Sequence, residues 1–225
     1  MVMKTDRELQ QDVIAELNWD PSVEATRLGV EVHDGVVTLA GHVTSYAQKW
    51  RAEEAAQRVE GVKGMIPELK VEIPGIDKRP DEDIVKAARH ALTWNASVPD
   101  EEIRVMVENG WVTLSGDVEW DYQKRAAENA VRDLIGIKGV VNLIELNPGI
   151  EPKDVKSKIE AALQRRAHHD ANAISIAVEG GTVTLFGELD SSSEREAVRR
   201  AAWDAPGISS VVDRMTVVDR TPVNA

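Results

Sequence analysis

Histidine and cysteine carry much of the catalysis and metal binding in proteins, and both are scarce in this chain. Its 225 residues include five histidines and no cysteine, which excludes disulfides, thiolate zinc sites, iron–sulfur clusters and cysteine nucleophiles. His168 and His169 are adjacent, whereas two imidazoles on one helix face need a spacing of about four residues. A Ser-His-Asp order, a phosphate-binding loop and a dinucleotide fingerprint are all missing. We therefore predict exposed histidines and a chain with no catalytic residue, no metal site and no cofactor.

Basic side chains are the second candidate, because lysine and arginine bind anionic surfaces. The formal net charge is −12, from 27 basic and 39 acidic residues, which argues against nucleic acid as a partner. Residues 150–225 are nearly balanced at −2, whereas residues 1–76 and 77–149 each carry −5. The basic residues of that last segment that could meet an anionic phospholipid are Lys153, Lys156, Arg165, Arg166 and Arg199. The alternative is an ordinary solvated helix surface, since acidic residues are interleaved with them.

Aromatic side chains form a third group, since tryptophan and tyrosine suit both membrane interfaces and protein interfaces. Trp120 and Tyr122 lie in a predicted loop before a helix, where they are candidates for contact with lipid or with a protein partner. Packing inside the protein is the alternative for this pair. Trp19 and Trp94 each end a predicted helix, and we expect these two to pack within or between structural units.

A glycine-bounded motif, repeated three times, sets the elements that carry these residues. The segment Gly35-Val-Val-Thr-Leu-Ala-Gly41 recurs at residues 110–116 and 181–187, at steps of 75 and 71 residues. A further glycine follows 26 residues after the start of each copy. This constant spacing predicts three units, at residues 1–76, 77–149 and 150–225. We interpret nine glycines as structural: Gly35, Gly41, Gly61, Gly110, Gly116, Gly136, Gly181, Gly187 and Gly207.

Each unit shows the order helix, strand, strand, helix, strand. In the first helix of unit 1, apolar residues recur every four positions, at Leu9, Val13 and Leu17. Strict alternation predicts a strand at residues 28–32, followed by a type I′ hairpin turn. The three predicted turns are Asp34-Gly35, Asn109-Gly110 and Gly180-Gly181. The closing glycine of each motif marks a sharp exit or a close backbone approach, and Gly61 and Gly136 are expected at the C-cap of an alanine-rich second helix.

The predicted fold is α+β: three tandem α-β-β-α-β units, each a small three-stranded mixed sheet with two helices on one face. The second helix connects the second and third strands, so these strands should be parallel. The joints Pro74-Gly75-Ile76 and Pro148-Gly149-Ile150 are short, and a unit of about 70 residues is marginally stable alone. We therefore expect the units to bury surface on one another, with Ile76 and Ile150 in the joints, as a compact rod or a pseudo-threefold cluster.

The repeated string Gly-x-Val-Thr-Leu-x-Gly, then a helix bearing lysine and alanine, then Gly-Val/Ile-Lys-Gly-Val, resembles the BON domain of bacterial osmotically inducible and nodulation proteins. The resemblance covers nearly the whole chain. Unit 2 fits best, through Lys124, Ala127, Gly136, Val140, Val141 and Asn142. Unit 1 has Pro67 in place of Asn142, so its last strand is expected to begin irregularly. Unit 3 has Arg195 and Asp213 in place of Lys124 and Asn142, so a binding role shared by all three units does not follow.

The resemblance implies a non-enzymatic protein that attaches to phospholipid surfaces and serves in osmotic or envelope stress, often in the periplasm. The expected partners are therefore an anionic phospholipid surface or envelope proteins. Two alternatives stay open: a protein-interaction or chaperone-like scaffold, and a sensor of cations or small ligands. The oligomeric state stays open as well.

The start of the chain bears on the compartment. Residues 4–8 already belong to a charged helix, so no secretory leader is visible. No segment approaches the roughly 18 apolar residues of a membrane span. As the sequence stands we expect a cytoplasmic protein that does not span a membrane, or a periplasmic one if a signal peptide has been removed.

Overall fold

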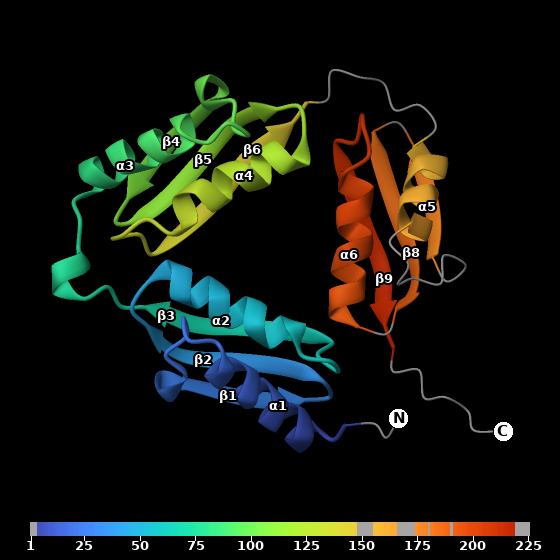
Figure 1. Ribbon diagram of the computed structural model, residues 1–225, viewed down its shortest axis with the longest axis horizontal. Coiled ribbons are helices and arrows are strands. Elements are labelled where there is room, and N and C mark those ends of the chain that lie inside the picture. Colours follow the sequence, from blue (N-terminus) through green and yellow to red (C-terminus); the bar gives the residue numbers. More distant parts are fainter. Residues whose placement is uncertain (1–3, 148–154, 166–173, 180, 190, 219–225) are drawn as a thin grey trace.

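The computed structural model describes residues 4–147, 155–165, 174–179, 181–189 and 191–218. Within these residues the strands form three separate three-stranded sheets, one in each third of the chain. Figure 1 shows the three units arranged around a common centre. The predicted α+β fold, with three repeats of one helix-and-strand order, is confirmed.

The helices and strands recur in the same order in each unit. Unit 1 contains α1 (Asp6–Trp19), β1 (Leu28–His33), β2 (Val36–Val43), α2 (Tyr46–Arg58) and β3 (Gly64–Val71). Unit 2 contains α3 (Asp81–Thr93), β4 (Ile103–Glu108), β5 (Trp111–Val118), α4 (Asp121–Arg132) and β6 (Gly139–Leu146). Unit 3 contains α5 (Val155–Arg165), β7 (Ile174–Glu179), β8 (Thr182–Leu189), α6 (Ser192–Trp203) and β9 (Ser210–Val217). Single 3-10 turns lie at Ala25–Arg27, Gly75–Asp77 and Asp100–Glu102.

Every sheet is mixed, as predicted. The middle strand pairs antiparallel with the first strand and parallel with the last. The expected irregular start of β3 is wrong, because β3 runs over eight residues and Pro67 pairs in register with Leu39. Proline is tolerated there because β3 is an edge strand, and the missing N–H need not serve a further neighbour.

The hairpin turns carry the predicted backbone. Asp34 and Asn109 both have a φ of 51°, and Gly35 and Gly110 follow with φ of 80° and 82°. These left-handed values are those of a type I′ turn. The third predicted turn includes Gly180, which lies outside the described residues.

The closing glycine of the repeated motif lies inside a strand and does not end it. Strand β2 continues past Gly41 to Val43, so the predicted sharp exit is wrong. The predicted close approach is correct: a Cβ on Gly41 would lie 2.3 Å from the carbonyl oxygen of Arg27, and one on Gly116 would lie 2.1 Å from that of Glu102. Backbone packing therefore requires glycine at these two positions.

The second helices end earlier than the glycines suggested. Helix α2 ends at Arg58 and α4 at Arg132, so Gly61 and Gly136 lie in the turn into the next strand. Both glycines are left-handed there, with φ of 101° and 91°. They redirect the chain into the sheet and do not occupy the C-cap itself.

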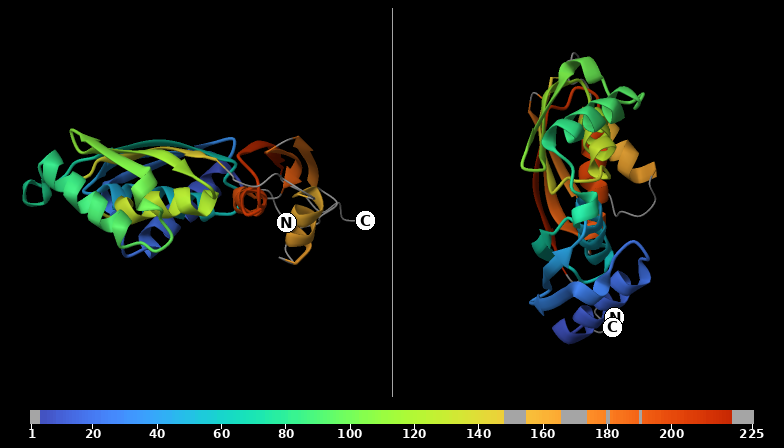
Figure 2. Two further views of the ribbon diagram at one scale, coloured as in Figure 1. Left: turned by 90° about the horizontal axis from the view of Figure 1, so that it is seen from above. Right: turned by 90° about the vertical axis from the view of Figure 1, so that its left-hand side faces the viewer.

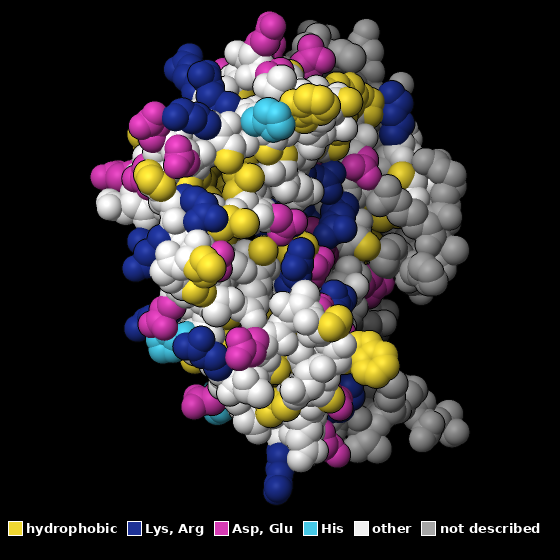
Figure 3. Space-filling model, turned by 60° about the vertical axis from the view of Figure 1, so that its left-hand side comes forward, with side chains coloured by type: hydrophobic (Ala, Val, Ile, Leu, Met, Phe, Trp, Pro, Cys, Tyr) yellow, Lys and Arg dark blue, Asp and Glu magenta, His cyan; other side chains and the backbone are white. Residues whose placement is uncertain are grey.

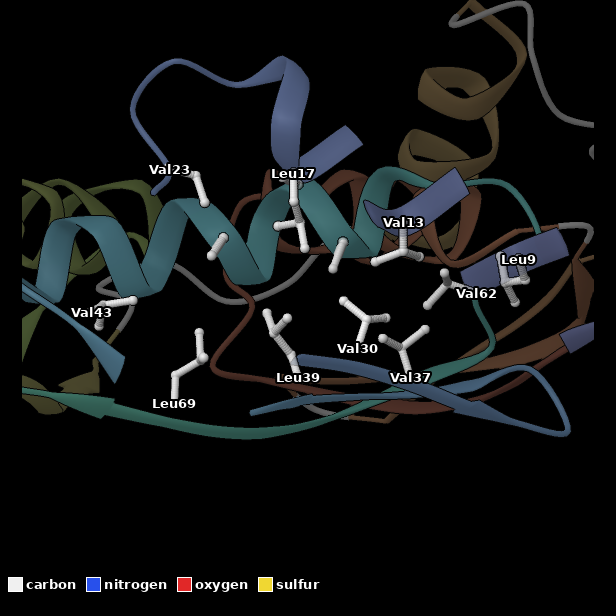
Figure 4. Close-up of a cluster of buried hydrophobic side chains, with 13 residues drawn as sticks. Leu9, Val13, Leu17, Val23, Val30, Val37, Leu39, Val43, Val62 and Leu69 are labelled. Carbon is white, nitrogen blue, oxygen red and sulfur yellow. The ribbon is translucent and has the colours of Figure 1, made fainter. Parts of the chain in front are cut away.

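Each unit has its own hydrophobic core between its two helices and one face of its sheet. Figure 4 shows the core of unit 1, where Leu9, Val13 and Leu17 of α1 point toward Val37 and Leu39 of the sheet. Alanines on α2 are fully buried, which lets that helix lie close to the strands. Figure 2 shows the helices on one side of the sheets, so the opposite face of each sheet is left outside the cores.

The second helices join the three units around the centre of Figure 1. Three contacts link the units: Arg51 with Asp133 at 3.5 Å, Arg125 with Asp204 at 3.5 Å, and the Ser192 hydroxyl donating to the Val62 carbonyl at 2.5 Å. In each case the first half of a second helix meets the end of the second helix, or the turn after it, in another unit. Unit 1 contacts unit 2, unit 2 contacts unit 3, and unit 3 contacts unit 1. A head-to-tail contact that closes in this way makes a ring, so the chain forms a pseudo-threefold cluster and not a rod.

The joints use residues other than those expected. Ile76 is 85% exposed, so its predicted place in a joint is wrong, and Ile150 lies outside the described residues. Instead, Tyr46 packs against the core of unit 2. The Arg132 guanidinium also lies over the Trp50 ring, 3.7 Å from its centroid. Side chains of the central helices therefore hold units 1 and 2 together.

Candidate binding surfaces

The first candidate surface lies at the ends of the first helices. Trp19 is the last residue of α1 and Trp94 directly follows α3, and their exposed fractions are 83% and 78%. Leu17 and Leu92 are buried, and a residue two positions further turns about 200° around a helix, so both indoles point away from the cores. The expected packing within or between units is therefore wrong. Two large amphipathic rings are presented to solvent at equivalent positions.

The second candidate surface is the outer side of the sheet of unit 2. We define the unit 2 outer face as Met106, Trp111, Val141 and Leu143, whose exposed fractions range from 38% to 60%. Met106 and Val141 flank Thr113 in one row of the sheet. The Trp111 ring lies over Gly139, where an added Cβ would meet ring atoms at 2.3 Å. The ring therefore covers the backbone of β6 and adds to one apolar area.

The basic residues proposed from the sequence do not form a described patch. Lys153 and Arg166 lie outside the described residues, and only the backbone of Arg165 is described, at the end of α5. Lys156 is exposed and lies 3.9 Å from Glu160, while Arg199 pairs with Glu196 at 2.6 Å. Figure 3 shows basic and acidic side chains interleaved across one face of the molecule. This pairing matches the alternative of a solvated helix surface.

Trp120 and Tyr122 do not share a loop. Trp120 is the N-cap residue of α4, is half-buried, and donates its backbone N–H to the Gln123 side chain at 3.0 Å. Tyr122 lies within α4 and is 50% exposed. Tyr122 thus remains available to a partner, whereas Trp120 helps to begin the helix.

One group of histidine and carboxylate atoms in the described part of the chain has metal-binding spacing: Asp6, His33 and Asp34. Asp6 already accepts hydrogen bonds from the backbone N–H groups of Asp34 and Gly35, at 2.9 and 3.1 Å. Asp81 makes the same two bonds to the hairpin of unit 2. These aspartates therefore tie the start of a helix to a turn. His33, His42 and His90 are exposed, as predicted, and His168 and His169 lie outside the described residues.

Two carboxyl groups on the central helices have shifted pKa values. Burial raises the pKa of Glu53 against the opposing effect of Lys49. Burial also raises the pKa of Asp121, although Arg125 lies 2.6 Å away and acts in the opposite direction. Glu53 lies on α2 and Asp121 begins α4. Neither is among the residues that line the described grooves, and each lies beside a basic residue of its own helix, Lys49 or Arg125.

The family follows from a comparison with known protein families. The BON domain family model matches residues 5–73, 80–148 and 153–219. The chain belongs to the BON domain family. Each of its three BON domains contains one of the sheets described above.

Two BON relatives are similar over part of the chain. Osmotically-inducible protein Y of Escherichia coli (strain K12) is 30% identical over 127 residues, which cover 54% of this chain and 62% of that protein. The 21 kDa hemolysin of Actinobacillus pleuropneumoniae is 29% identical over 142 residues, which cover 62% of this chain and 73% of that protein. The match thus spans less than two thirds of osmotically-inducible protein Y.

Two solved structures show some likeness to the chain. The structural protein CdsD of the type III secretion system of Chlamydia trachomatis is 16% identical, with 95% of this chain and 93% of that chain covered and a TM-score of 0.27. The PrgH periplasmic domain is 13% identical, with 86% and 96% covered and a TM-score of 0.21. At TM-scores this low, nothing about the fold or function of this chain follows from these two structures.

The three BON domains differ on the outer sides of their sheets. The positions of Met106, Trp111 and Leu143 are occupied in unit 1 by Glu31, Val36 and Glu68, and in unit 3 by Ala177, Thr182 and Arg214. The position of Val141 stays apolar in all three, as Ile66 and Val212. Unit 3 also exposes Phe186 on this side, with the Arg214 guanidinium 5.9 Å from the centroid of its ring. The extent of the apolar area therefore differs among the three BON domains and is greatest in unit 2. Among the described helices, none has the length and apolar character that crossing a bilayer requires.

Proposed function

We propose that this chain is a non-enzymatic, envelope-associated protein of the osmotic stress response that binds phospholipid surfaces. Its BON domains and its similarity to an osmotically inducible protein support the association with osmotic stress. The observation that supports lipid binding is the exposure of Trp19 and Trp94 at equivalent helix ends. Tryptophan favours the boundary between acyl chains and water, because its ring is apolar and its N–H is polar.

The placement of the two rings suits a flat surface. Figure 2 shows α1 and α3 on the same side of the ring of units, opposite the sheets. Two anchors on one body engage a vesicle together, so the second contact is made at a high effective concentration. Each tryptophan alone then binds the vesicle weakly, and the two together bind it more tightly than either single affinity suggests.

The net charge distinguishes binding through the two tryptophans from binding through the basic residues on the helices of unit 3. A chain of net charge −12 is repelled by anionic headgroups, so insertion of tryptophan should strengthen when salt screens that repulsion. Binding through Lys156, Arg199 and their basic neighbours should weaken with salt, because each such residue contributes about 1 kcal/mol near an anionic surface. The direction of the salt effect therefore identifies the surface.

The test is flotation of the full chain with phosphatidylcholine vesicles and with vesicles that also contain phosphatidylglycerol. We expect binding to both, a partial loss in W19A or W94A, and near-complete loss in the double variant. W111A is the matched control, since that ring lies on the sheet side, and it should float like the parent chain. Absence of flotation at every composition, or a loss that requires K156E and R199E and not the tryptophans, would contradict the proposal.

A further inference from the structure

The unit 2 outer face is a contiguous apolar surface that the fold does not need. Its side chains lie on the side of the sheet away from the core, and Met106 and Leu143 are 60% and 58% exposed. The same strands form in unit 1 with Glu31 and Glu68 at these positions. Contiguous apolar patches on a protein surface usually mark a site of interaction.

The charges around this face are mostly acidic. Glu108 is the cross-strand neighbour of Trp111, next to the hairpin turn. Asp117 and Glu145 are cross-strand neighbours in the row beyond Leu143. All three carboxylates are exposed. Arg104 is the basic residue among the outward positions of these strands. The next turns add Glu101, Glu102 and Glu119, which line a groove together with Asp117 and Arg104. The apolar centre is thus bordered by negative charge.

We propose that the unit 2 outer face docks a polypeptide segment whose apolar side chains are flanked by lysine or arginine. Apolar residues of the segment would cover Met106, Trp111 and Leu143, while its basic residues would meet the acidic border. A second copy of this chain fits poorly, because a symmetric contact would bring two acidic borders together. An anionic phospholipid fits poorly for the same electrostatic reason.

The geometry favours an extended segment. The sheet order is β4-β5-β6, so β4 and β6 are both edge strands, and the face between them is only three strands wide. An extended chain presents alternate side chains to one side, at a spacing that matches the rows of a sheet. The Trp111 ring, held over Gly139, provides a rigid aromatic anchor of the kind that dominates protein interfaces.

The test uses the full chain and labelled synthetic peptides of about ten residues, long enough to cross a small sheet. One peptide alternates leucine with lysine, and its partner alternates leucine with glutamate. Fluorescence anisotropy should show binding of the lysine peptide, and L143E should weaken that binding about tenfold or more, because loss of the apolar contact outweighs the attraction of one added carboxylate. L143E installs the residue that unit 1 carries naturally, so the sheet should still form. A thermal melt within a few degrees of the parent confirms this.

Charge reversal gives an independent readout. The double variant E108K/E145K keeps the apolar centre, and we expect it to lose most of the parent chain's preference for the lysine peptide over the glutamate peptide. W94A is the control for lipid binding: it should lower vesicle flotation and leave peptide binding unchanged. Failure of lipid binding and failure of peptide docking are thereby distinguishable.

Three outcomes would overturn the proposal. One is equal binding of the two peptides by the parent chain, or no binding. Another is a dimer in sedimentation that L143E dissociates, which would assign the face to a second copy. The last is loss of vesicle flotation in L143E or W111A, which would assign it to lipid.

Discussion

The sheets of units 1 and 2 carry similar apolar residues on the side that faces the core. On the outer side, they carry residues of opposite character. Facing the core, Val37 and Leu39 correspond to Val112 and Leu114, and all four are fully buried. Facing outward, Glu68 corresponds to Leu143. Buried positions are constrained by packing, whereas outward positions are free to differ while the strands and register persist. The apolar outer face of unit 2 therefore calls for an explanation outside folding, and an interaction supplies one.

The largest effect should come from a feature that both units share. We expect G41A and G116A each to destabilise its own unit by about 3 kcal/mol or more, since the new methyl would collide with a carbonyl at a left-handed backbone position. Hydrogen exchange followed by mass spectrometry should show lost protection in the mutated unit first. G29A is the control, because a Cβ there meets its nearest atom at 3.8 Å. Equal exchange in G29A and G41A would show that the close approach does not constrain the sheet.

A smaller effect should come from a half-buried position that differs between the two units. Tyr46 begins α2 and packs against the core of unit 2, whereas its equivalent, Asp121, begins α4. Because Tyr46 is half-buried, Y46A should cost about 2 kcal/mol, below the range for a full core aromatic. It should also loosen the ring of units, seen as a larger radius of gyration by X-ray scattering. Y122A, which truncates an exposed tyrosine of α4, should leave both quantities unchanged, and an equal effect would remove Tyr46 from the joint.

Short-range features of this fold could be predicted from the sequence. Alternation placed Val30 and Val37 on the inner side, and the Asp34-Gly35 pair gave the correct hairpin turn. Both depend on neighbours within a few residues, so local preferences determine them. The glycine spacing likewise predicted three units, because each copy must repeat the same turns and close contacts.

Features that depend on distant residues could not be predicted. The two hydrogen bonds that the Asp6 carboxylate accepts from the N–H groups of a distant turn leave no periodic signal, although the recurrence of an aspartate at residue 81 was a usable hint. The exposure of Trp19 and Trp94 was missed because the size of a side chain favours burial on average, and only the helix phase relative to Leu17 reveals the opposite. The ring of units rests on a few polar and aromatic contacts between helices, and such contacts have no sequence pattern.

The smallest effect concerns pH at the joint of units 2 and 3. Burial raises the pKa of Asp121 above its ordinary value, so the folded state holds this proton more tightly than the unfolded state. Ionisation of Asp121 therefore costs stability at pH 7, and that cost disappears as the pH falls through the folded pKa toward the ordinary value of 3.8. D121N carries no such cost. It should melt about 2 °C above the parent at pH 7, which corresponds to less than about 1 kcal/mol, and the two should converge on acidification.

The Asp121 side chain is 11% exposed, whereas its partner Arg125 is 41% exposed and also reaches Asp204. Arg125 Nε is buried beside Asp121, and the amide oxygen introduced by D121N still offers it an acceptor, while the Arg125 guanidinium keeps its pair with Asp204. This is why the substitution should not destabilise the joint. D133N is the control, since Asp133 is 63% exposed in the corresponding joint of units 1 and 2 and should show no comparable rise. If D121N melts below the parent at pH 7, the ion pair outweighs desolvation. The joint of units 2 and 3 would then be held by charge, in contrast to the aromatic contact that Tyr46 makes between units 1 and 2.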